Sequence, residues 1–288
     1  MTDVTSKPYK LGIALSGGGA KGFAHVGALR AFEELGIKPD CIAGVSAGSV
    51  VAVMYAAGVP CHEMMKLFSR VKFRDLCQFS IRGGGFFKIE RFKKHIKKVM
   101  PKVNTFEDLN IPTFIGATDL DHGTAKVFDS GPLYERMAAS CSVPIVFHPV
   151  VIDGVRYVDG GVMHNVPSWI LRDKCEQLIG INCSPLPSAS SRSKKNSILE
   201  VGLRTYDLML KGNVKDDMDL CDYQIELPEM SSYKTFDLKE INNVYLRGYT
   251  ATRRFLQELM ERNPEVFAAN RPKDLPHFPT PYPIEDIQ

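Results

Sequence analysis

Two transitions from an apolar run, through glycine or serine, into a helical stretch constrain this fold most strongly. Residues 10–16 form an apolar run that ends in three glycines, and apolar residues then recur at helical spacing over residues 23–35. A second apolar run at residues 41–45 leads through Ser46 into an apolar helical stretch at residues 47–57. Strand, helix, strand and helix in this order predict a parallel sheet with helices on both faces.

The rest of the chain continues this alternation. Further strands are expected at residues 111–120, 155–158 and 177–183, a hairpin strand at 126–129, and helices at 197–210 and 238–261. Residues 185–196 are rich in serine and lysine, which predicts a mobile loop. The tail from Asn263 is rich in proline, which favours an extended strap on the surface.

Composition excludes several classes of protein. Of the 288 residues, 44% are hydrophobic and 24% are charged, so the chain can bury a large core and is not disordered. A net charge of +3 is too small to predict nucleic acid as the main partner. The seven cysteines include no C-x-x-C pair, which argues against a disulfide framework and a zinc site.

The N-terminus adds an expectation about location. Residues 1–10 lack the apolar segment of a signal peptide, and no stretch approaches the about 18 consecutive apolar residues of a membrane span. We therefore expect a cytoplasmic protein that can still touch a membrane from outside.

The sharpest chemical signal is the pentapeptide Gly44-Val45-Ser46-Ala47-Gly48, where an expected strand meets an expected helix. A serine on such a turn presents its hydroxyl beyond the sheet, and the flanking glycines let strand and helix approach closely. The helix N-terminus adds free backbone N–H groups that oppose developing negative charge. The pattern predicts a serine nucleophile, and the alternative is that Ser46 only caps the helix.

Residues 17–22, with the sequence GGGAKG, form the turn between the first strand and helix. They match G-x-G-x-x-G, but a dinucleotide site also needs an acidic residue about 20 positions on, where this chain has Gly44, Val45 and Ser46. A P-loop is excluded because no G-K-[ST] closes the turn. We interpret the loop as an oxyanion hole, whose backbone amides hold a reacting carbonyl oxygen, with a plain tight turn as the alternative.

A serine nucleophile needs a base. No histidine lies in a setting that singles it out among His25, His62, His95, His122, His148, His164 and His277. Asp159 is the other candidate, because it ends the strand at residues 155–158 and precedes two glycines that permit close approach. A carboxylate with a pKa of about 3.9 is a weak base, so this role requires a partly dry site that raises the pKa. From the residues alone, an ordinary turn residue is the simpler interpretation of Asp159.

Together the motifs resemble a known family. Residues 17–22, 44–48 and 159–161, in this order and spacing, are similar to the motifs of the patatin-like phospholipases, of the bacterial single-domain type. The alanine- and serine-rich stretch at residues 138–147 adds to the resemblance, although Cys141 and Val143 stand where small residues are more usual. The similarity covers roughly residues 10–184.

The resemblance implies an α/β fold of three layers, with a central mainly parallel sheet and helices on both faces. It implies a catalytic core at residues 8–185. Residues 186–288 are then a C-terminal helical part with a proline-rich tail, which we expect to pack on the same domain.

Site residues follow from the resemblance, position by position. Ser46 is the nucleophile and Asp159 its base, with their side chains within hydrogen-bond reach of each other. The oxyanion hole comprises backbone amides from Gly17, Gly18, Gly19 and Ala47. The remaining motif positions support this arrangement: Lys21, Gly22, Gly44, Gly48, Gly160 and Gly161. Lys21 is expected to order its loop or to meet an anionic head group.

The implied function is a serine acyl hydrolase, a phospholipase A-like enzyme that cleaves carboxylic esters of lipids through an acyl-enzyme, with neither metal nor cofactor. A thioesterase or general esterase on the same site is one alternative. A non-enzymatic regulatory protein that binds lipid is another, because a fold alone does not decide between them.

The most basic part of the chain is residues 66–102, where twelve lysines and arginines stand against two acidic residues. Its later half places Ile89, Phe92, Ile96 and Val99 on one helical face, a pattern that suits contact with anionic lipid surfaces. A solvated helix that packs its apolar face on the core explains the same pattern. Residues 79–87, with three consecutive glycines, are expected to form a mobile loop that covers the site.

Overall fold

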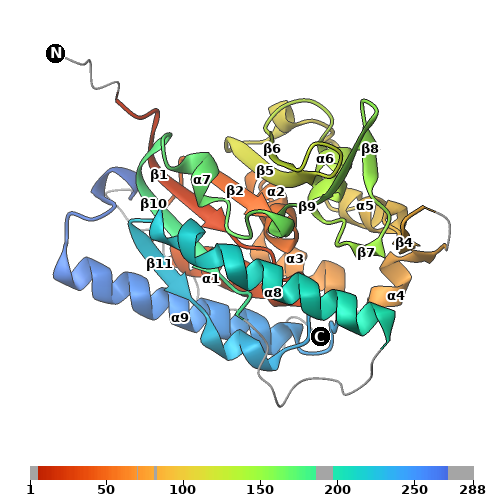
Figure 1. Ribbon diagram of the computed structural model, residues 1–288. Coiled ribbons are helices and arrows are strands. Elements are labelled where there is room, and N and C mark those ends of the chain that lie inside the picture. The colour runs from red at the N-terminus through yellow and green to blue at the C-terminus, as the bar shows by residue number, and fades with distance from the viewer. Residues whose placement is uncertain (1–5, 70, 81–82, 186–196, 272–288) are drawn as a thin grey trace.

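The computed structural model describes residues 6–69, 71–80, 83–185 and 197–271, and its centre is a mostly parallel sheet (Figure 1). Five strands run parallel in the order β11 (Tyr223–Glu226), β10 (Cys175–Asn182), β1 (Tyr9–Leu15), β2 (Cys41–Val45) and β5 (Thr113–Asp119). Beyond them the pairing is antiparallel, in β6 (Thr124–Phe128), β8 (Val150–Ile152) and β9 (Val155–Asp159).

Side chains of the parallel strands alternate between two buried faces. On β1, Ile13 and Leu15 belong to the larger core, whereas Ala14 belongs to a smaller core on the other side of the sheet. The larger core is covered by α1 (Phe23–Glu34), α2 (Ala47–Ala56) and α9 (Ile241–Arg262). The smaller core is covered by α7 (Ser168–Leu171) and the C-terminal half of α8 (Ile198–Asp219). The predicted α/β fold, with a mainly parallel sheet between helical layers, is therefore confirmed.

Helices α1 and α9 cross at a pair of glycines, which lets their backbones touch. A Cβ atom on Gly27 would lie 2.1 Å from the carbonyl oxygen of Tyr245, and one on Gly248 would lie 2.1 Å from that of Ala24. No other residue type fits this crossing without moving a helix. The C-terminal part of the chain is thereby packed against the helix that follows the glycine loop.

A small second sheet forms where we expected a loop. Its strands are β3 (Gln78–Phe79), β4 (Gly85–Lys88) and β7 (Ile145–Phe147), and β4 pairs with β7 in parallel. Gly85 permits this pairing, because a Cβ atom there would lie 2.4 Å from the Phe147 carbonyl oxygen. The ends of the 79–87 segment are thus hydrogen-bonded to the body of the protein.

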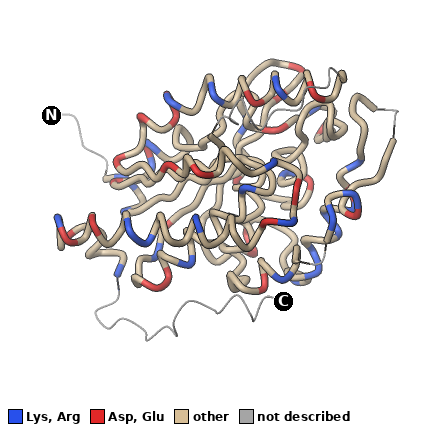
Figure 2. Tube along the Cα trace, turned by 90° about the horizontal axis from the view of Figure 1, so that it is seen from below, with Lys and Arg blue, Asp and Glu red and all other residues tan. Residues whose placement is uncertain are grey.

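The basic segment contains α4 (Phe73–Leu76) and α5 (Glu90–Lys97), and Lys and Arg gather near the β3–β4 hairpin (Figure 2). Ile96 is fully buried and Ile89 is nearly so, while Phe92 and Val99 pack against the same core. The apolar side of α5 therefore faces the protein, as the alternative interpretation predicted, and only its lysine-bearing side faces solvent.

Several boundaries differ from the sequence prediction. Helix α8 continues nine residues beyond the expected end at residue 210, and the short helices α3 (Cys61–Ser69) and α6 (Leu133–Ser140) were not predicted. The expected loop at residues 186–196 and the proline-rich tail from residue 272 lie outside the described residues. Of the helices in the described ranges, none combines the length and apolar content needed to cross a bilayer.

Candidate active site

Ser46 lies between β2 and α2 in a backbone conformation (φ 53°, ψ −125°) that residues other than glycine rarely adopt. Two glycines make the turn possible. A Cβ atom on Gly44 would lie 2.4 Å from the carbonyl oxygen of Gly48, and one on Gly48 would lie 2.3 Å from that of Leu15. The Ser46 amide donates a hydrogen bond to Ser140 Oγ at 2.9 Å, which ties the turn to α6. Such strained turns are typical of serine nucleophiles.

Strand β5 brings Asp159 to the same place. Its first half pairs with β2, so that Val45 lies opposite Gly116, and its second half pairs with β9, so that Asp159 lies opposite Ala117. The carboxyl ends of β2 and β9 therefore meet at neighbouring positions along β5. Gly160 is required here, because a Cβ atom on it would lie 2.4 Å from the Gly116 carbonyl oxygen.

The Asp159 carboxylate is fully buried. Its Oδ1 atom accepts a hydrogen bond from the Gly161 amide at 2.9 Å, whereas Oδ2 has no hydrogen-bond partner among the described residues. Burial raises the pKa of Asp159 to about 6, against the opposing effects of the Ser46 hydroxyl, the Gly161 amide and the Tyr206 hydroxyl. A carboxyl with this pKa is mostly ionised at neutral pH and is a stronger base than an exposed aspartate.

The expected hydrogen bond between the Ser46 hydroxyl and Asp159 is not formed with ordinary geometry within the described part of the chain. The hydroxyl is nevertheless close enough to lower the pKa of the carboxyl. Catalytic hydrogen bonds are often long without substrate and shorten when it binds.

The glycine loop leads into the short helix η1 (Gly19–Gly22) and lies directly beside Ser46. A Cβ atom on Gly17 would lie 3.2 Å from Ser46 Cβ, and one on Gly22 would lie 2.6 Å from Ala47 Cβ. Gly19 has a φ of 59°, and a Cβ atom there would lie 2.2 Å from the Thr235 carbonyl oxygen. The loop can contact both the nucleophile turn and Thr235 because Gly17, Gly19 and Gly22 carry no side chains.

One of the four expected oxyanion donors is corrected by the structure. The Gly17 amide donates to the Asn165 carbonyl oxygen at 3.0 Å, so it cannot also hold a reacting oxygen. Within the described ranges, the amides of Gly18, Gly19 and Ala47 donate to no other group. The amides of Gly18, Gly19 and Ala47 therefore remain as candidate donors.

Lys21 belongs to this loop, and its side chain is buried, with only 2% of its surface exposed. Burial lowers its pKa, and the nearby Cys183 and Asp207 act in the opposite direction. Its Cβ lies 3.5 Å from where a Gly18 Cβ would be, so the side chain packs under the turn of the loop. This position fits the expectation that Lys21 orders the loop.

The histidines of the described ranges are engaged elsewhere. His25 is buried and its Nε2 bonds the Ser16 carbonyl oxygen at 2.8 Å, and burial lowers its pKa to about 4. His164 bonds Asp217 at 2.7 Å, and His122 bonds Asp119 at 2.9 Å. None of these side chains lines the cavity beside Ser46. His277 lies outside the described residues.

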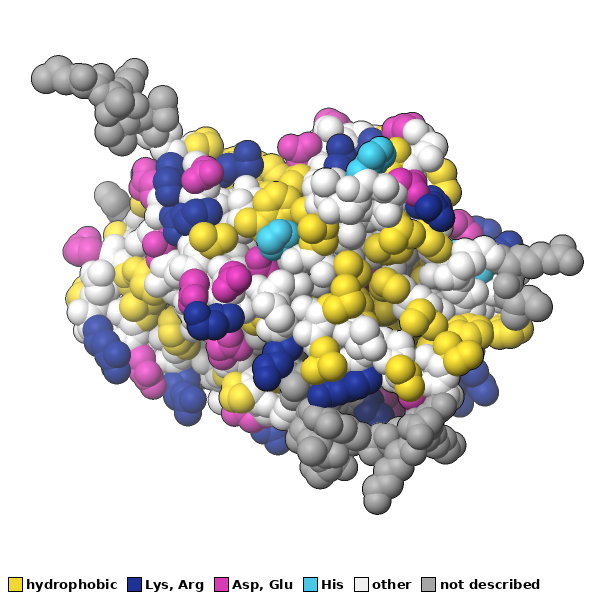
Figure 3. All heavy atoms as spheres, in the orientation of Figure 1, with side chains coloured by type: hydrophobic (Ala, Val, Ile, Leu, Met, Phe, Trp, Pro, Cys, Tyr) yellow, Lys and Arg dark blue, Asp and Glu magenta, His cyan; other side chains and the backbone are white. Residues whose placement is uncertain are grey.

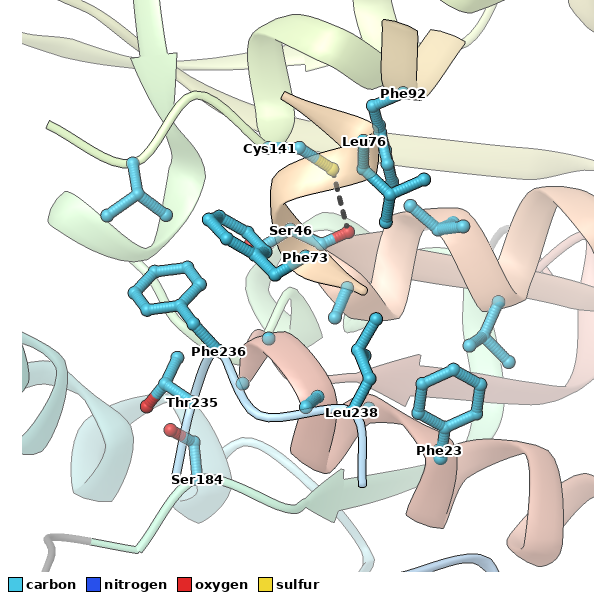
Figure 4. Close-up of a pocket in the computed structure, with 18 of the residues that line it drawn as sticks. Phe23, Ser46, Phe73, Leu76, Phe92, Cys141, Ser184, Thr235, Phe236 and Leu238 are labelled. Carbon is cyan, nitrogen blue, oxygen red and sulfur yellow. Dashed lines mark hydrogen bonds between the residues drawn. The ribbon is translucent and has the colours of Figure 1, made fainter. Parts of the chain in front are cut away.

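An apolar cavity of about 130 Å³ opens beside Ser46 (Figure 4). Figure 4 shows Phe73 and Phe236 to the left of Ser46, with Leu76 and Phe92 to its upper right. Cys141 also donates from its Sγ to the Ser46 carbonyl oxygen at 3.3 Å. The polar side chains in the cavity lining are those of Ser46, Ser184, Tyr206, Asp207 and Thr235, and most of the other lining side chains are apolar. Such a cavity suits a hydrocarbon chain with a polar group held at the serine.

Sequence reasoning missed the contribution of the C-terminal part to this site. Tyr206 of α8 is buried, and its hydroxyl would lie 2.8 Å from a Cβ atom on Gly161. Asn165 is fully buried with neither side-chain oxygen nor nitrogen hydrogen-bonded among the described residues, and it lies against both Gly17 and Gly161. Asn165 follows the Asp159 turn closely and could have been suspected, whereas no local pattern marks Tyr206.

Comparison with known proteins agrees with this geometry. The family model described as patatin-like phospholipase matches residues 13–172. Lysophospholipase NTE1 of Cryptococcus neoformans is 30% identical over 204 residues, which cover 66% of this chain and 12% of that protein. An uncharacterised NTE family protein of Mycobacterium tuberculosis is 35% identical over 165 residues, which cover 56% of this chain and 45% of that protein.

A solved structure, VipD from Legionella pneumophila, superposes with a TM-score of 0.57 at 14% sequence identity and covers 87% of this chain and 67% of that one. At this identity the likeness concerns the fold. The chain spans less than half the length of the two curated relatives named above. Since the family model matches more than half of the sequence, including the Ser46 and Asp159 motifs, the chain belongs to the patatin-like phospholipase family.

Proposed function

We propose that the protein is a serine acyl hydrolase that cleaves a fatty acyl ester of a lipid. The observation that carries the proposal is the setting of Ser46. It stands on a strained turn in the wall of an apolar cavity, beside a buried aspartate with a pKa of about 6. This setting supplies a nucleophile, a base and a place for an acyl chain.

In the proposed acylation step, the Ser46 oxygen attacks the ester carbonyl carbon and its proton passes to Asp159. The negative charge on the former carbonyl oxygen is held by the amides of Gly18, Gly19 or Ala47. The C–O bond of the ester then breaks, and the leaving alcohol takes the proton from Asp159. The acyl group remains on Ser46 as an ester.

In the proposed deacylation step, water attacks the acyl-enzyme and Asp159 accepts its proton. Collapse of the second tetrahedral intermediate returns this proton to the Ser46 oxygen and releases the fatty acid. Asp159 must therefore be ionised at the start of each step, which its pKa of about 6 allows at neutral pH.

The substrate class follows from the cavity and from the relatives. Apolar side chains surround the space next to Ser46, and the curated relatives include proteins named lysophospholipases. Both support a phospholipid or lysophospholipid acyl ester as substrate. Thioesters and simple esters fit the same chemistry and are the alternative.

The test is covalent labelling by a fluorophosphonate probe, followed by hydrolysis of a panel of lysophospholipids, phospholipids, acyl thioesters and soluble esters. Wild-type protein should be labelled and Ser46→Ala should not. Asp159→Asn should reduce hydrolysis at least about 10³-fold, because base and nucleophile act as a unit. His164→Ala should stay within about tenfold of wild type.

Asp207→Asn is the matched control, because Asp207 is the acidic residue among the described cavity-lining side chains. It should retain labelling. If Asp207→Asn is as inactive as Ser46→Ala while Asp159→Asn is active, Asp207 is the base and our assignment is wrong. Absence of labelling in wild-type protein would favour a lipid-binding protein without catalysis.

We also propose that the protein reaches its substrate by peripheral contact with a membrane. The exposed lysines of α5 support attraction to anionic lipid, but the apolar side of that helix is occupied by the core. Electrostatic attraction alone is weak and is screened by salt. Firm adsorption therefore requires exposed apolar side chains elsewhere.

A further inference from the structure

One side of α8 carries a row of hydrophobic side chains that face solvent. The exposed fractions are 81% for Ile198, 56% for Val201, 49% for Leu208 and 41% for Met209. Residues 198, 201 and 208, with Thr205 between them, recur at helical spacing and share one face. We call Ile198, Val201, Leu208 and Met209 together the α8 apolar face. Figure 3 shows hydrophobic side chains gathered over this half of α8.

The opposite side of the same helical segment belongs to the candidate active site. Tyr206 and Leu210 are buried and line the cavity beside Ser46. Gly202 lies against β7, where a Cβ atom would meet the Ile145 side chain at 2.1 Å. The segment is thus fixed to the protein on one side, while its apolar face is not covered by any described residue.

Cations border the α8 apolar face along one edge. Lys211 and Lys215 are exposed and lie four residues apart, so they lie in one row along the helix. Arg204 is half-buried with its Nη1 atom buried, and it interacts electrostatically with Asp207. Lys215 pairs with Asp219 at 3.0 Å, whereas Lys211 forms no ion pair with a described residue. An apolar stripe edged by long basic side chains is the pattern of helices that lie in the interface of anionic lipid.

We propose that the α8 apolar face is the surface by which the protein adsorbs to an anionic lipid membrane. The proposal rests on the proposed function and adds the route of the substrate. Asp207 of α8 and the neighbouring Phe236 are half-buried and line the cavity, so the helix that carries the adsorbed face also forms part of the cavity wall. A second copy of the chain is a poorer occupant, because a twofold contact through this face would bring two basic borders together.

The experiment measures binding to vesicles in the Ser46→Ala background, where the lipid stays intact. Vesicles of phosphatidylcholine alone and of phosphatidylcholine mixed with phosphatidylglycerol are sedimented at low and physiological salt. The double variant Val201→Asp/Leu208→Asp should bind the mixed vesicles at least about tenfold more weakly than its parent. Lys211→Gln should weaken binding to the mixed vesicles only, and more at low salt than at high salt.

Leu120→Asp/Val151→Asp is the matched control, because it exchanges one exposed leucine and one exposed valine that do not belong to α8. It should bind as its parent does, and melting temperatures verify that each variant is folded. Equal binding by the α8 double variant and its parent would overturn the proposal. A parent that binds neither vesicle, or a dimer that the α8 double variant dissociates, would also overturn it. None of these readouts depends on catalysis, so they are independent of the test of the proposed function.

Discussion

The backbone of Ser46 holds a φ of 53° although the residue has a side chain. Such a conformation costs on the order of 1–3 kcal/mol, and glycine avoids most of this cost. We expect the free energy of unfolding of Ser46→Gly to exceed that of Ser46→Ala by about 1 kcal/mol, because both lose the hydroxyl but only glycine relieves the strain. Urea unfolding of the two variants under one condition measures the difference. Equal stabilities would show that the turn is unstrained.

The hydroxyl of Tyr206 helps to keep Asp159 ionised. Burial and the nearby Asp159 carboxylate raise the pKa of Tyr206 well above its ordinary value, so the hydroxyl keeps its proton at neutral pH. Since the base must be ionised, kcat/KM should fall as the pH drops through about 6. Removing the hydroxyl removes an interaction that lowers the pKa of Asp159. The acid limb of Tyr206→Phe should therefore lie at higher pH than that of wild type.

The measurement is the pH profile of kcat/KM on a short soluble ester. Tyr134→Phe is the control, because it also removes a buried hydroxyl, one that donates to the carbonyl oxygens of Met100 and Val103 at 3.1 Å. Its acid limb should coincide with that of wild type. If Tyr206→Phe lowers kcat/KM at every pH without moving the acid limb, the role of Tyr206 is limited to packing.

At the scale of elements, the close crossing of α1 and α9 requires that neither residue 248 nor residue 27 has a side chain. Gly248→Ala places a methyl group 2.1 Å from the Ala24 carbonyl oxygen, so the helices must separate. We expect the free energy of unfolding to fall by at least about 2 kcal/mol. Gly212→Ala on α8 is the matched exchange, because its new methyl group has no described atom within 4 Å apart from its chain neighbours and the backbone of its own helix. It should stabilise the protein by up to about 1 kcal/mol through helix propensity. If Gly248→Ala and Gly212→Ala lower the free energy of unfolding equally in thermal or urea unfolding, the close contact between α1 and α9 is contradicted.

Elements with strong local patterns could be predicted from the sequence. Strand β2 has the predicted bounds, and α1 and α2 each end within one residue of the expected position. Helix α8 continues past the expected end at residue 210, and Gly212 lies inside it with no atom of another element near the position of a Cβ atom. Strand β7 could not be foreseen, since its three residues acquire a partner only when β4 lies beside them.

At the scale of the whole molecule, the motif residues of the candidate site could be predicted from the sequence, whereas the other residues that line the cavity could not. Residues 17–22, 44–48 and 159–161 were marked by glycines, whose spacing reflects contacts that a Cβ atom would prevent. The Gly17 amide was misassigned because its acceptor, the carbonyl oxygen of Asn165, is distant in sequence. Tyr206 and Phe236 reach the cavity only because α8 and the segment before α9 fold back over the sheet, a long-range packing that no local pattern encodes.

The pairing of β5 with both β2 and β9 has a consequence for how the chain can change over time. The positions of Ser46 and Asp159 are set by the registers in which β2 and β9 pair with β5. They do not depend on the length of the polypeptide that joins the two residues. Insertions or deletions between residues 60 and 110 can therefore reshape the cavity without displacing either residue. Strand β5 thus fixes the distance between Ser46 and Asp159. Relatives can therefore differ in the intervening chain, and so in substrate preference, while they retain the same two residues.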